Sequence, residues 1–151
     1  MLPHREGAGA GVPTVRRLPV RKITRIVIHH SASSLETTAK QIRQWHCDKG
    51  WSDIGYHFVI EKDGIIVGGR PIDVMGAHAK SANVDSLGIC IVGDNTHPER
   101  TWRPAQISSA NLLIASLRTV LGYGLTVHGH RDVGTTATEC PGVEIGTVLS
   151  L

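Results

Sequence analysis

The sequence predicts one α/β domain in which a central mixed β-sheet is flanked by helices. Its 151 residues suffice for a single hydrophobic core. Short β-branched runs alternate with longer segments of helical periodicity, but not in strict strand–helix–strand order. No internal repeat or low-complexity segment interrupts this pattern. We therefore expect strands of both orientations in one sheet.

The first half of the domain predicts a strand, a helix and a hairpin. Residues 23–30, ITRIVIHH, are β-branched and end at a serine-rich turn, which indicates a buried strand. Residues 37–48 place apolar side chains on one face of a helix, with a threonine to cap its start. Residues 54–70 predict a β-hairpin, because the Asp-Gly pair at 63–64 supplies the positive φ angles of a tight turn.

The second half predicts two strands and two helices. Residues 86–94, SLGICIVGD, indicate another buried strand. Residues 104–121 form the longest predicted helix, which begins at a proline and is closed by a glycine. Residues 125–130 predict a short strand, and residues 143–149 predict a terminal helix after a Pro-Gly pair.

The positive charge is concentrated at the amino terminus. The whole chain carries +3, but residues 1–25 hold six basic side chains against one acidic one, so the remainder carries −2. A folded nucleic-acid-binding body with clustered Lys and Arg is therefore not expected, and we predict no nucleic-acid partner. Residues 1–22 are rich in glycine, proline and arginine and predict a flexible basic arm, followed by one folded domain over residues 23–151.

The cysteine content and hydropathy indicate the compartment. Three cysteines show no paired framework of the kind found in small secreted domains. No run approaches the roughly 18 apolar residues of a membrane span, and the amino terminus lacks the apolar core of a signal peptide. We expect synthesis in the cytoplasm, no membrane span, and a monomer.

Metal-binding residue types lie where predicted strands end. His29 and His30 end the first strand, His130 ends the last, and Cys140 follows ten residues later, ahead of the predicted terminal helix. Neutral imidazole and thiolate are preferred zinc ligands, and a following helix would favour the thiolate. Spacing alone leaves two other interpretations open, since a lone His is often a hydrogen-bonded structural residue and a lone Cys a small buried hydrophobe.

Four segments in order carry a family resemblance. They are IVIHHSAS (26–33), IRQWHCDKGWSDIGYHFVIEKDG (42–64), GAHAKSANVDSLGICIVGD (76–94) and GHRDVGTTATECPG (129–142). Together they resemble the type 2 zinc N-acetylmuramoyl-L-alanine amidases, a family of bacteriophage lysozyme-type amidases and animal peptidoglycan recognition proteins. The resemblance implies an amidase/peptidoglycan-recognition-protein-like α/β fold.

The resemblance also implies a zinc site and a reaction. Its metal ligands would be His29, His130 and Cys140, three protein ligands with a fourth position open, as in catalytic zinc sites. Zn²⁺ would activate a water molecule for hydrolysis of the amide bond between N-acetylmuramic acid and L-alanine in peptidoglycan. We therefore expect an endolysin-like bacteriophage or bacterial enzyme that degrades the cell wall and reaches it by release or by another export route.

Further site residues are implied by position. Tyr56 matches a tyrosine near the metal in the family, and with an ordinary pKa of about 10 it would orient water or donate to developing charge rather than act as a base. His78 and Asn83 match positions that line the substrate cleft. His30, His57 and His128 are expected to be packed or to support the site from outside the ligand set.

Thr138 occupies the position two residues before Cys140. Thr138 stands where phage members often have lysine and catalytic recognition proteins have threonine, so we expect a hydrogen-bond donor without a positive charge. The segment from His130 to Cys140 is longer than in the short phage enzymes. Thr135, Thr136 or Glu139 could therefore occupy the place assigned to Thr138.

Three alternative functions remain open at this point. A recognition domain would bind peptidoglycan without cleaving it, but non-catalytic relatives typically lose the cysteine ligand, which is present here as Cys140. A thiol hydrolase would use Cys140 as its nucleophile. A blue-copper site would need a weak axial methionine, for which Met75 is the only internal candidate.

Overall fold

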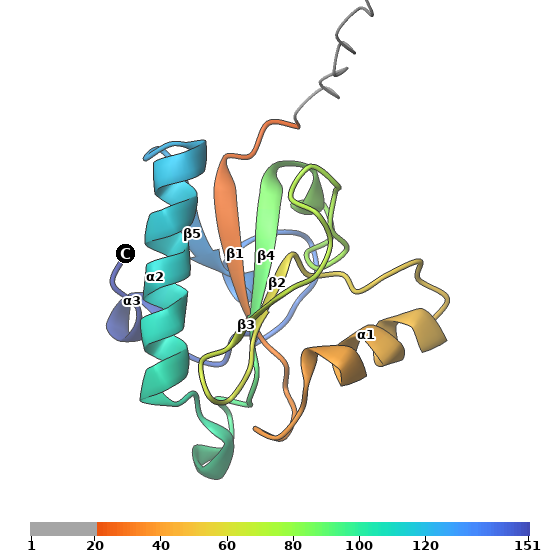
Figure 1. Ribbon diagram of the computed structural model, residues 1–151, viewed down its shortest axis with the longest axis vertical. Coiled ribbons are helices and arrows are strands. Elements are labelled where there is room, and N and C mark those ends of the chain that lie inside the picture. Colours follow the sequence, from red (N-terminus) through yellow and green to blue (C-terminus); the bar gives the residue numbers. More distant parts are fainter. Residues whose placement is uncertain (1–20) are drawn as a thin grey trace, which may run out of the picture.

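The computed structural model describes residues 21–151 and contains one mixed five-stranded sheet (Figure 1). The strands are β1 (Arg25–His30), β2 (Phe58–Ile60), β3 (Ile66–Gly68), β4 (Ser86–Ile91) and β5 (Thr126–Gly129). Their spatial order is β3-β2-β4-β1-β5. All neighbours are parallel except the antiparallel pair β2 and β3. The predicted mixed sheet is confirmed.

Helices lie on both sides of this sheet. They are α1 (Ala39–Asp48), α2 (Pro104–Leu121) and α3 (Ile145–Val148). In Figure 1, α2 runs along one face with α3 beside it, and α1 lies apart on the other side of the molecule. A capping box of Thr38 and Gln41 starts α1, while Pro104 stands in the first turn of α2. Gly122 closes α2 with φ 127°, a conformation that favours glycine.

Alternation along β1 divides its side chains between two environments. Ile26 and Ile28 are fully buried in the main apolar cluster, which also contains the inward side of α2. Val27 and His29 are equally buried on the opposite face. This division follows from the period-two geometry of a strand. It places the first histidine of the site at the end of a rigid central strand.

Several predicted element boundaries are wrong. The predicted hairpin strand from residue 54 begins at Phe58, and ahead of it the Gly55 N–H donates to the His46 ring rather than to a neighbouring strand. The strand predicted to residue 94 ends at Ile91. The predicted terminal helix is a single turn that begins at Ile145, so it does not follow Cys140 directly.

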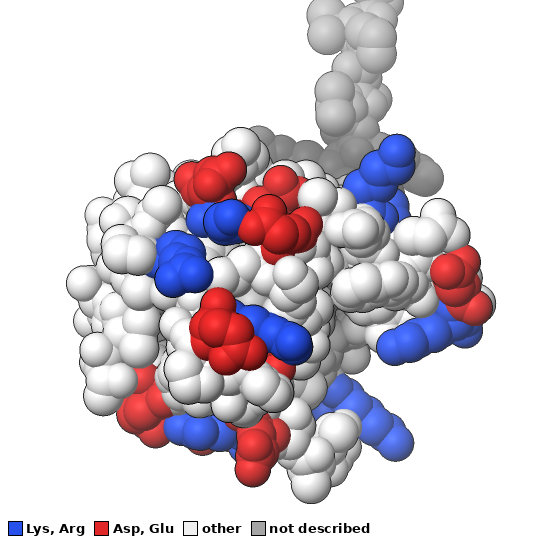
Figure 2. Space-filling view, turned by 90° about the horizontal axis from the view of Figure 1, so that it is seen from below, with Lys and Arg blue, Asp and Glu red and all other residues white. Residues whose placement is uncertain are grey.

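Charged side chains are mixed on the surface. On the face shown in Figure 2, Lys and Arg lie beside Asp and Glu rather than forming one basic patch. Basic and acidic side chains also form ion pairs, such as Arg25–Asp85 and Arg131–Glu144. Within residues 21–151, none of the helices has the length and apolar character needed to cross a membrane. Of the predicted arm, residues 1–22, the first twenty residues lie outside the described part of the chain.

Candidate metal centre and active site

Three side chains that are far apart in sequence converge at one edge of the sheet. His29 lies at the end of β1, His130 directly follows β5, and Cys140 lies in the next loop. Each offers one ligand atom, and these atoms lie within 4.8 Å of one another. β1 and β5 are parallel neighbours, so their carboxyl ends meet at the same edge. The fold therefore creates the group that the resemblance implies.

The spacing within this group suits a metal ion. The Sγ atom of Cys140 lies 3.7 Å from Nδ1 of His29. Two ligands on a tetrahedral Zn²⁺, with Zn–S and Zn–N near 2.3 and 2.0–2.1 Å, would lie about 3.6 Å apart. The two nitrogen donors and one sulfur donor thus fit a metal in both distance and chemistry.

Burial keeps both imidazoles in the form that binds a cation. It lowers the pKa of His29 well below the ordinary value, and neighbouring His78, His130 and His30 act in the same direction. Burial also lowers the pKa of His130. Both rings are therefore neutral near pH 7 and present a lone pair. A metal gains two ligands without having to displace protons from them.

Cys140 differs from the expectation for a reactive cysteine. Burial raises the pKa of its thiol to about 12, although a hydrogen bond to the backbone of His30 acts in the opposite direction. The helix that was expected to favour the thiolate begins only at Ile145. A thiolate nucleophile at neutral pH is therefore not favoured by this environment, whereas a bound cation would favour deprotonation. This argues against the thiol-hydrolase alternative.

Tyr56 lies against His29, one of the three potential ligands. Its ring centroid is 5.0 Å from that of His29. Burial, together with the nearby thiols of Cys90 and Cys140, raises the pKa of Tyr56 well above its usual value. The hydroxyl therefore keeps its proton at neutral pH and can donate a hydrogen bond, but it cannot serve as a base.

Two neighbours of Tyr56 were not anticipated from the sequence. Cys90 is fully buried and stands beside His29 in the β1–β4 register, on the same face of the sheet. The ring of His46, from α1, lies 5.5 Å from the ring of Tyr56 and accepts the Gly55 N–H. The alternation of SLGICIVGD contained the signal for Cys90. No sequence signal pointed to His46, which reaches Tyr56 only through the placement of α1.

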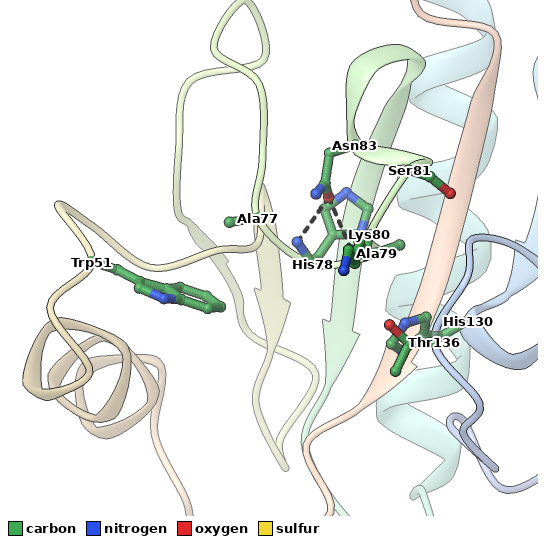
Figure 3. A pocket seen from close by; sticks show the side chains of 9 residues that line it. All are labelled: Trp51, Ala77, His78, Ala79, Lys80, Ser81, Asn83, His130 and Thr136. Carbon is green, nitrogen blue, oxygen red and sulfur yellow. Dashed lines mark hydrogen bonds between the residues drawn. The ribbon is translucent and has the colours of Figure 1, made fainter.

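A pocket of about 350 Å³ adjoins His29, His130 and Cys140, here called the metal group (Figure 3). Trp51 stands on one side, and His130 and Thr136 stand on the other. The loop between them contributes the remaining lining residues, Ala77, His78, Ala79, Lys80, Ser81 and Asn83. The pocket therefore connects a potential metal ligand with small and polar side chains.

The two predicted substrate residues both lie in this pocket, but each is engaged by the protein. Asn83 accepts hydrogen bonds from the backbone N–H groups of His78 and Ala79 through Oδ1, at 2.8 and 2.9 Å. Nδ1 of His78 lies 2.9 Å from Nε2 of His29. Burial lowers the pKa of His78 to about 3. His78 is therefore a neutral ring that contacts the metal-facing histidine.

The threonines before Cys140 occupy different places. Thr138 Oγ1 accepts the backbone N–H of Cys140 at 3.1 Å. Thr136 instead lines the pocket beside His130. A hydroxyl that accepts through its oxygen still has a proton to donate. Both threonines thus remain candidates for contact with a substrate oxygen.

The remaining histidines that were set apart from the ligands lie outside the metal group. His30 points to the opposite face, where Nδ1 accepts the Asn95 N–H at 3.2 Å. His57 Nδ1 accepts the Gly88 N–H at 3.0 Å. His128 Nε2 lies 2.9 Å from Thr126 Oγ1. Each is accounted for by hydrogen bonds elsewhere, in agreement with the sequence interpretation.

Comparison with known proteins identifies the family. The sequence profile of the N-acetylmuramoyl-L-alanine amidases matches residues 19–143. The chain belongs to this family. It is 35% identical over 130 residues to the endolysin of Klebsiella phage KP32, covering 83% of this chain and 84% of that protein. It is 42% identical over 130 residues to peptidoglycan-recognition protein SC2 of Drosophila simulans, covering 79% and 68%.

Solved structures agree with this assignment. The amidase LysC of Clostridium intestinale URNW superposes with a TM-score of 0.72 at 36% identity, covering 81% of this amidase chain and 78% of LysC. The endolysin of Thermus scotoductus bacteriophage Ph2119 gives a TM-score of 0.75 at 26% identity, covering 84% and 82%. The predicted fold class and the prediction of a peptidoglycan amidase are confirmed.

Proposed function

We propose that this amidase uses Zn²⁺ to hydrolyse the bond between the lactyl group of N-acetylmuramic acid and L-alanine, and thereby degrades bacterial cell wall as an endolysin does. The observation that carries the proposal is the convergence of His29, His130 and Cys140 at the edge of a pocket. Three protein ligands leave a fourth position open, which is typical of catalytic rather than structural zinc.

Zinc is favoured over copper by the surroundings of the ligands. A blue-copper site would require a weak axial methionine, and the side chain of the candidate Met75 is 53% exposed on the surface. A zinc ion on these ligands would supply Lewis-acid chemistry, lowering the pKa of a water molecule to about 7 and polarising the amide carbonyl.

The chain's own side chains would assist where charge develops. Water oxygen adds to the carbonyl carbon, the C–N bond breaks, and the amine of L-alanine leaves with a proton. Tyr56 keeps its hydroxyl proton and lies against His29, so it can donate to the carbonyl oxygen as negative charge forms. Thr138 retains a proton for the same purpose, and Thr136 offers a second hydroxyl beside His130.

The pocket supports a peptidoglycan substrate. Trp51 offers a 38% exposed aromatic face at one end, while alanine and serine side chains of the 77–83 loop leave space along the other side. Asn83 holds the loop through Oδ1 and keeps its amide N–H groups available to the substrate. The three ligands and the pocket come from one chain, so we propose that the enzyme acts as a monomer.

Product analysis tests this function. Purified peptidoglycan is digested with the zinc-loaded protein, and the products are examined by mass spectrometry. We expect free stem peptides that begin with L-alanine, together with intact glycan strands. Chelation should abolish release and zinc should restore it. Sedimentation of the protein with peptidoglycan without any release of peptides would instead support a recognition domain, and glycan fragments would refute the proposed bond.

Tyr56→Phe separates catalysis from metal binding. The variant should bind zinc with the stoichiometry of the wild type, because the three proposed ligands, His29, His130 and Cys140, are unchanged. Its turnover should fall by about 10²-fold or more, which is typical of losing one donor to a developing oxyanion. An unchanged turnover would assign Tyr56 to packing alone.

A further inference from the structure

A chain of buried hydrogen-bonding groups leads from the metal-facing histidine into the protein. Nε2 of His29 lies 2.9 Å from Nδ1 of His78. Nε2 of His78 lies 3.3 Å from Oγ of Ser86, which in turn donates to the carbonyl oxygen of Ala82 at 2.6 Å. The side chains of His29, His78 and Ser86 are all buried. Water is therefore not available to replace a missing partner in this chain.

The carbonyl at its end sets the direction of every hydrogen bond in the chain. A carbonyl oxygen can only accept, so the single hydroxyl proton of Ser86 goes to Ala82. Ser86 Oγ must then accept from Nε2–H of His78. Neither ring nitrogen of His78 contacts a carboxylate in the described part of the chain, and a buried imidazole without such a partner is neutral.

The same logic continues to the metal group. With its proton on Nε2, neutral His78 has a bare Nδ1, which accepts from Nε2–H of His29. His29 then has its lone pair on Nδ1, the atom that lies 3.7 Å from Cys140 Sγ. This is the tautomer that a metal ligand needs. The opposite tautomer would direct an N–H at the metal position.

We infer that Ser86 and His78 are positioning residues that select the metal-binding tautomer of His29, through a hydrogen-bond chain that ends on the Ala82 carbonyl. The inference rests on the proposed metal-dependent function. It also changes the role expected for His78: both ring nitrogens are used inside the protein, so the ring reaches the substrate pocket only with its carbon edge.

Two glycines make the arrangement possible. A Cβ atom at Gly88 would lie 2.5 Å from the ring of His78, and one at Gly76 would lie 2.7 Å from it. The His78 ring therefore occupies space that any other residue at these positions would fill. It meets the His29 ring nearly at a right angle, with an interplanar angle of 86°, which aims its nitrogen at the edge of His29.

Nitrogen-15 NMR of histidine rings tests the tautomers directly. In the metal-free, full-length wild type at neutral pH, long-range ¹H–¹⁵N correlations should show a proton on Nε2 and a bare Nδ1 for both His29 and His78. A wild type in which His29 has its proton on Nδ1 would overturn the inference without any variant. This measurement does not depend on hydrolysis, so failure of the proposed activity is a separate result.

Variants then test the chain by zinc affinity. In the full-length protein, Ser86→Ala should give mixed tautomers at His78 and His29 and weaken zinc binding by about tenfold or more in competition with a chelator. His78→Leu should weaken zinc binding at least as much, whereas the side-chain oxygen of His78→Gln can accept from His29 and should recover much of the affinity. Folded variants with wild-type tautomers and affinity, or equal losses in Leu and Gln, would refute the positioning role.

Discussion

On one face of β1, Ile26 and Ile28 are buried against the apolar cluster that includes α2, whereas on the other face His29 is equally buried among imidazoles, a tyrosine and a thiol. The first face, here called the aliphatic face, is stabilised by apolar burial that has no preferred direction. The second, the histidine face, consists of the β1–β4 residues beside His29 and the rings of Tyr56, His57 and His78. It is organised by directional hydrogen bonds.

This difference separates stability from chemistry within one sheet. A change on the aliphatic face alters the free energy of unfolding but leaves the metal group in place once the protein is folded. A change on the histidine face can leave the main core intact and still misdirect a lone pair or remove a ligand. Substitutions on each face therefore distinguish the two contributions.

The largest effect is expected from removing a ligand. His130→Ala should abolish turnover and stoichiometric zinc binding, since it removes one of only three protein ligands. His128→Ala is the matched control, because this residue precedes His130 by two positions and, among residues 21–151, its ring has a hydrogen bond with Thr126 alone. Its zinc content and lytic rate should remain near those of the wild type. Equal loss in both variants would contradict the assignment of His130.

A cavity on the aliphatic face should lower stability but leave zinc binding unchanged. Ile28→Ala removes a fully buried side chain and should lower the free energy of unfolding by about 2–5 kcal/mol, measured by urea denaturation. The folded fraction should bind zinc with wild-type affinity at low temperature. A large loss of zinc affinity in the folded protein would show that the two faces are more strongly coupled than their packing indicates.

Glycine substitutions in two strands test the packing of the histidine face without replacing a titratable residue. Gly88→Ala would place a Cβ 2.5 Å from the His78 ring, so it should cost about 1–3 kcal/mol of stability through overpacking and also weaken zinc binding. Gly68→Ala, in β3, meets nothing within 4 Å and should leave both properties nearly unchanged. Wild-type zinc affinity in Gly88→Ala would show that the His78 ring can move without consequence for His29.

The aliphatic face could be predicted from the sequence because its signal is local. Alternation within IVIHH separates Ile28 and His30 from His29, and the structure follows that alternation. The three potential ligands were identified only through the family resemblance, since spacing alone left structural interpretations of His130 and Cys140 open. Their convergence depends on β5 pairing with β1, a contact between segments about a hundred residues apart.

The connections among the site residues could not be read from the sequence. The contact between His78 and His29 depends on the path of the 76–86 loop and on the absence of a side chain at Gly88. The predicted terminal helix exists, but its predicted start was wrong, because the chain leaves the Pro-Gly turn without helical structure until α3 begins at Ile145. Long-range geometry of this kind has no periodic signature, and local propensity cannot supply it.

The smallest expected effect is a pH dependence of stability that originates on the histidine face. Burial lowers the pKa of His57 to about 4, and the ordinary value in an unfolded chain is near 6.5. As the pH falls between these values, the unfolded state binds a proton that the folded state does not. Stability due to His57 is therefore fully present above about pH 6.5 and is lost towards pH 4.

His57→Asn tests this, because its side-chain oxygen can still accept the Gly88 N–H in place of Nδ1. Between about pH 7.5 and pH 5, the wild type should lose about 2 kcal/mol more unfolding free energy than the variant. The two curves should run parallel above about pH 7.5, where neither state takes up this proton; that range is the internal control. Parallel curves throughout would mean that His57 is protonated at pH 5 in the folded protein, so that the histidine face tolerates a buried charge. A difference of the expected sign would show that the folded protein keeps the His57 ring neutral.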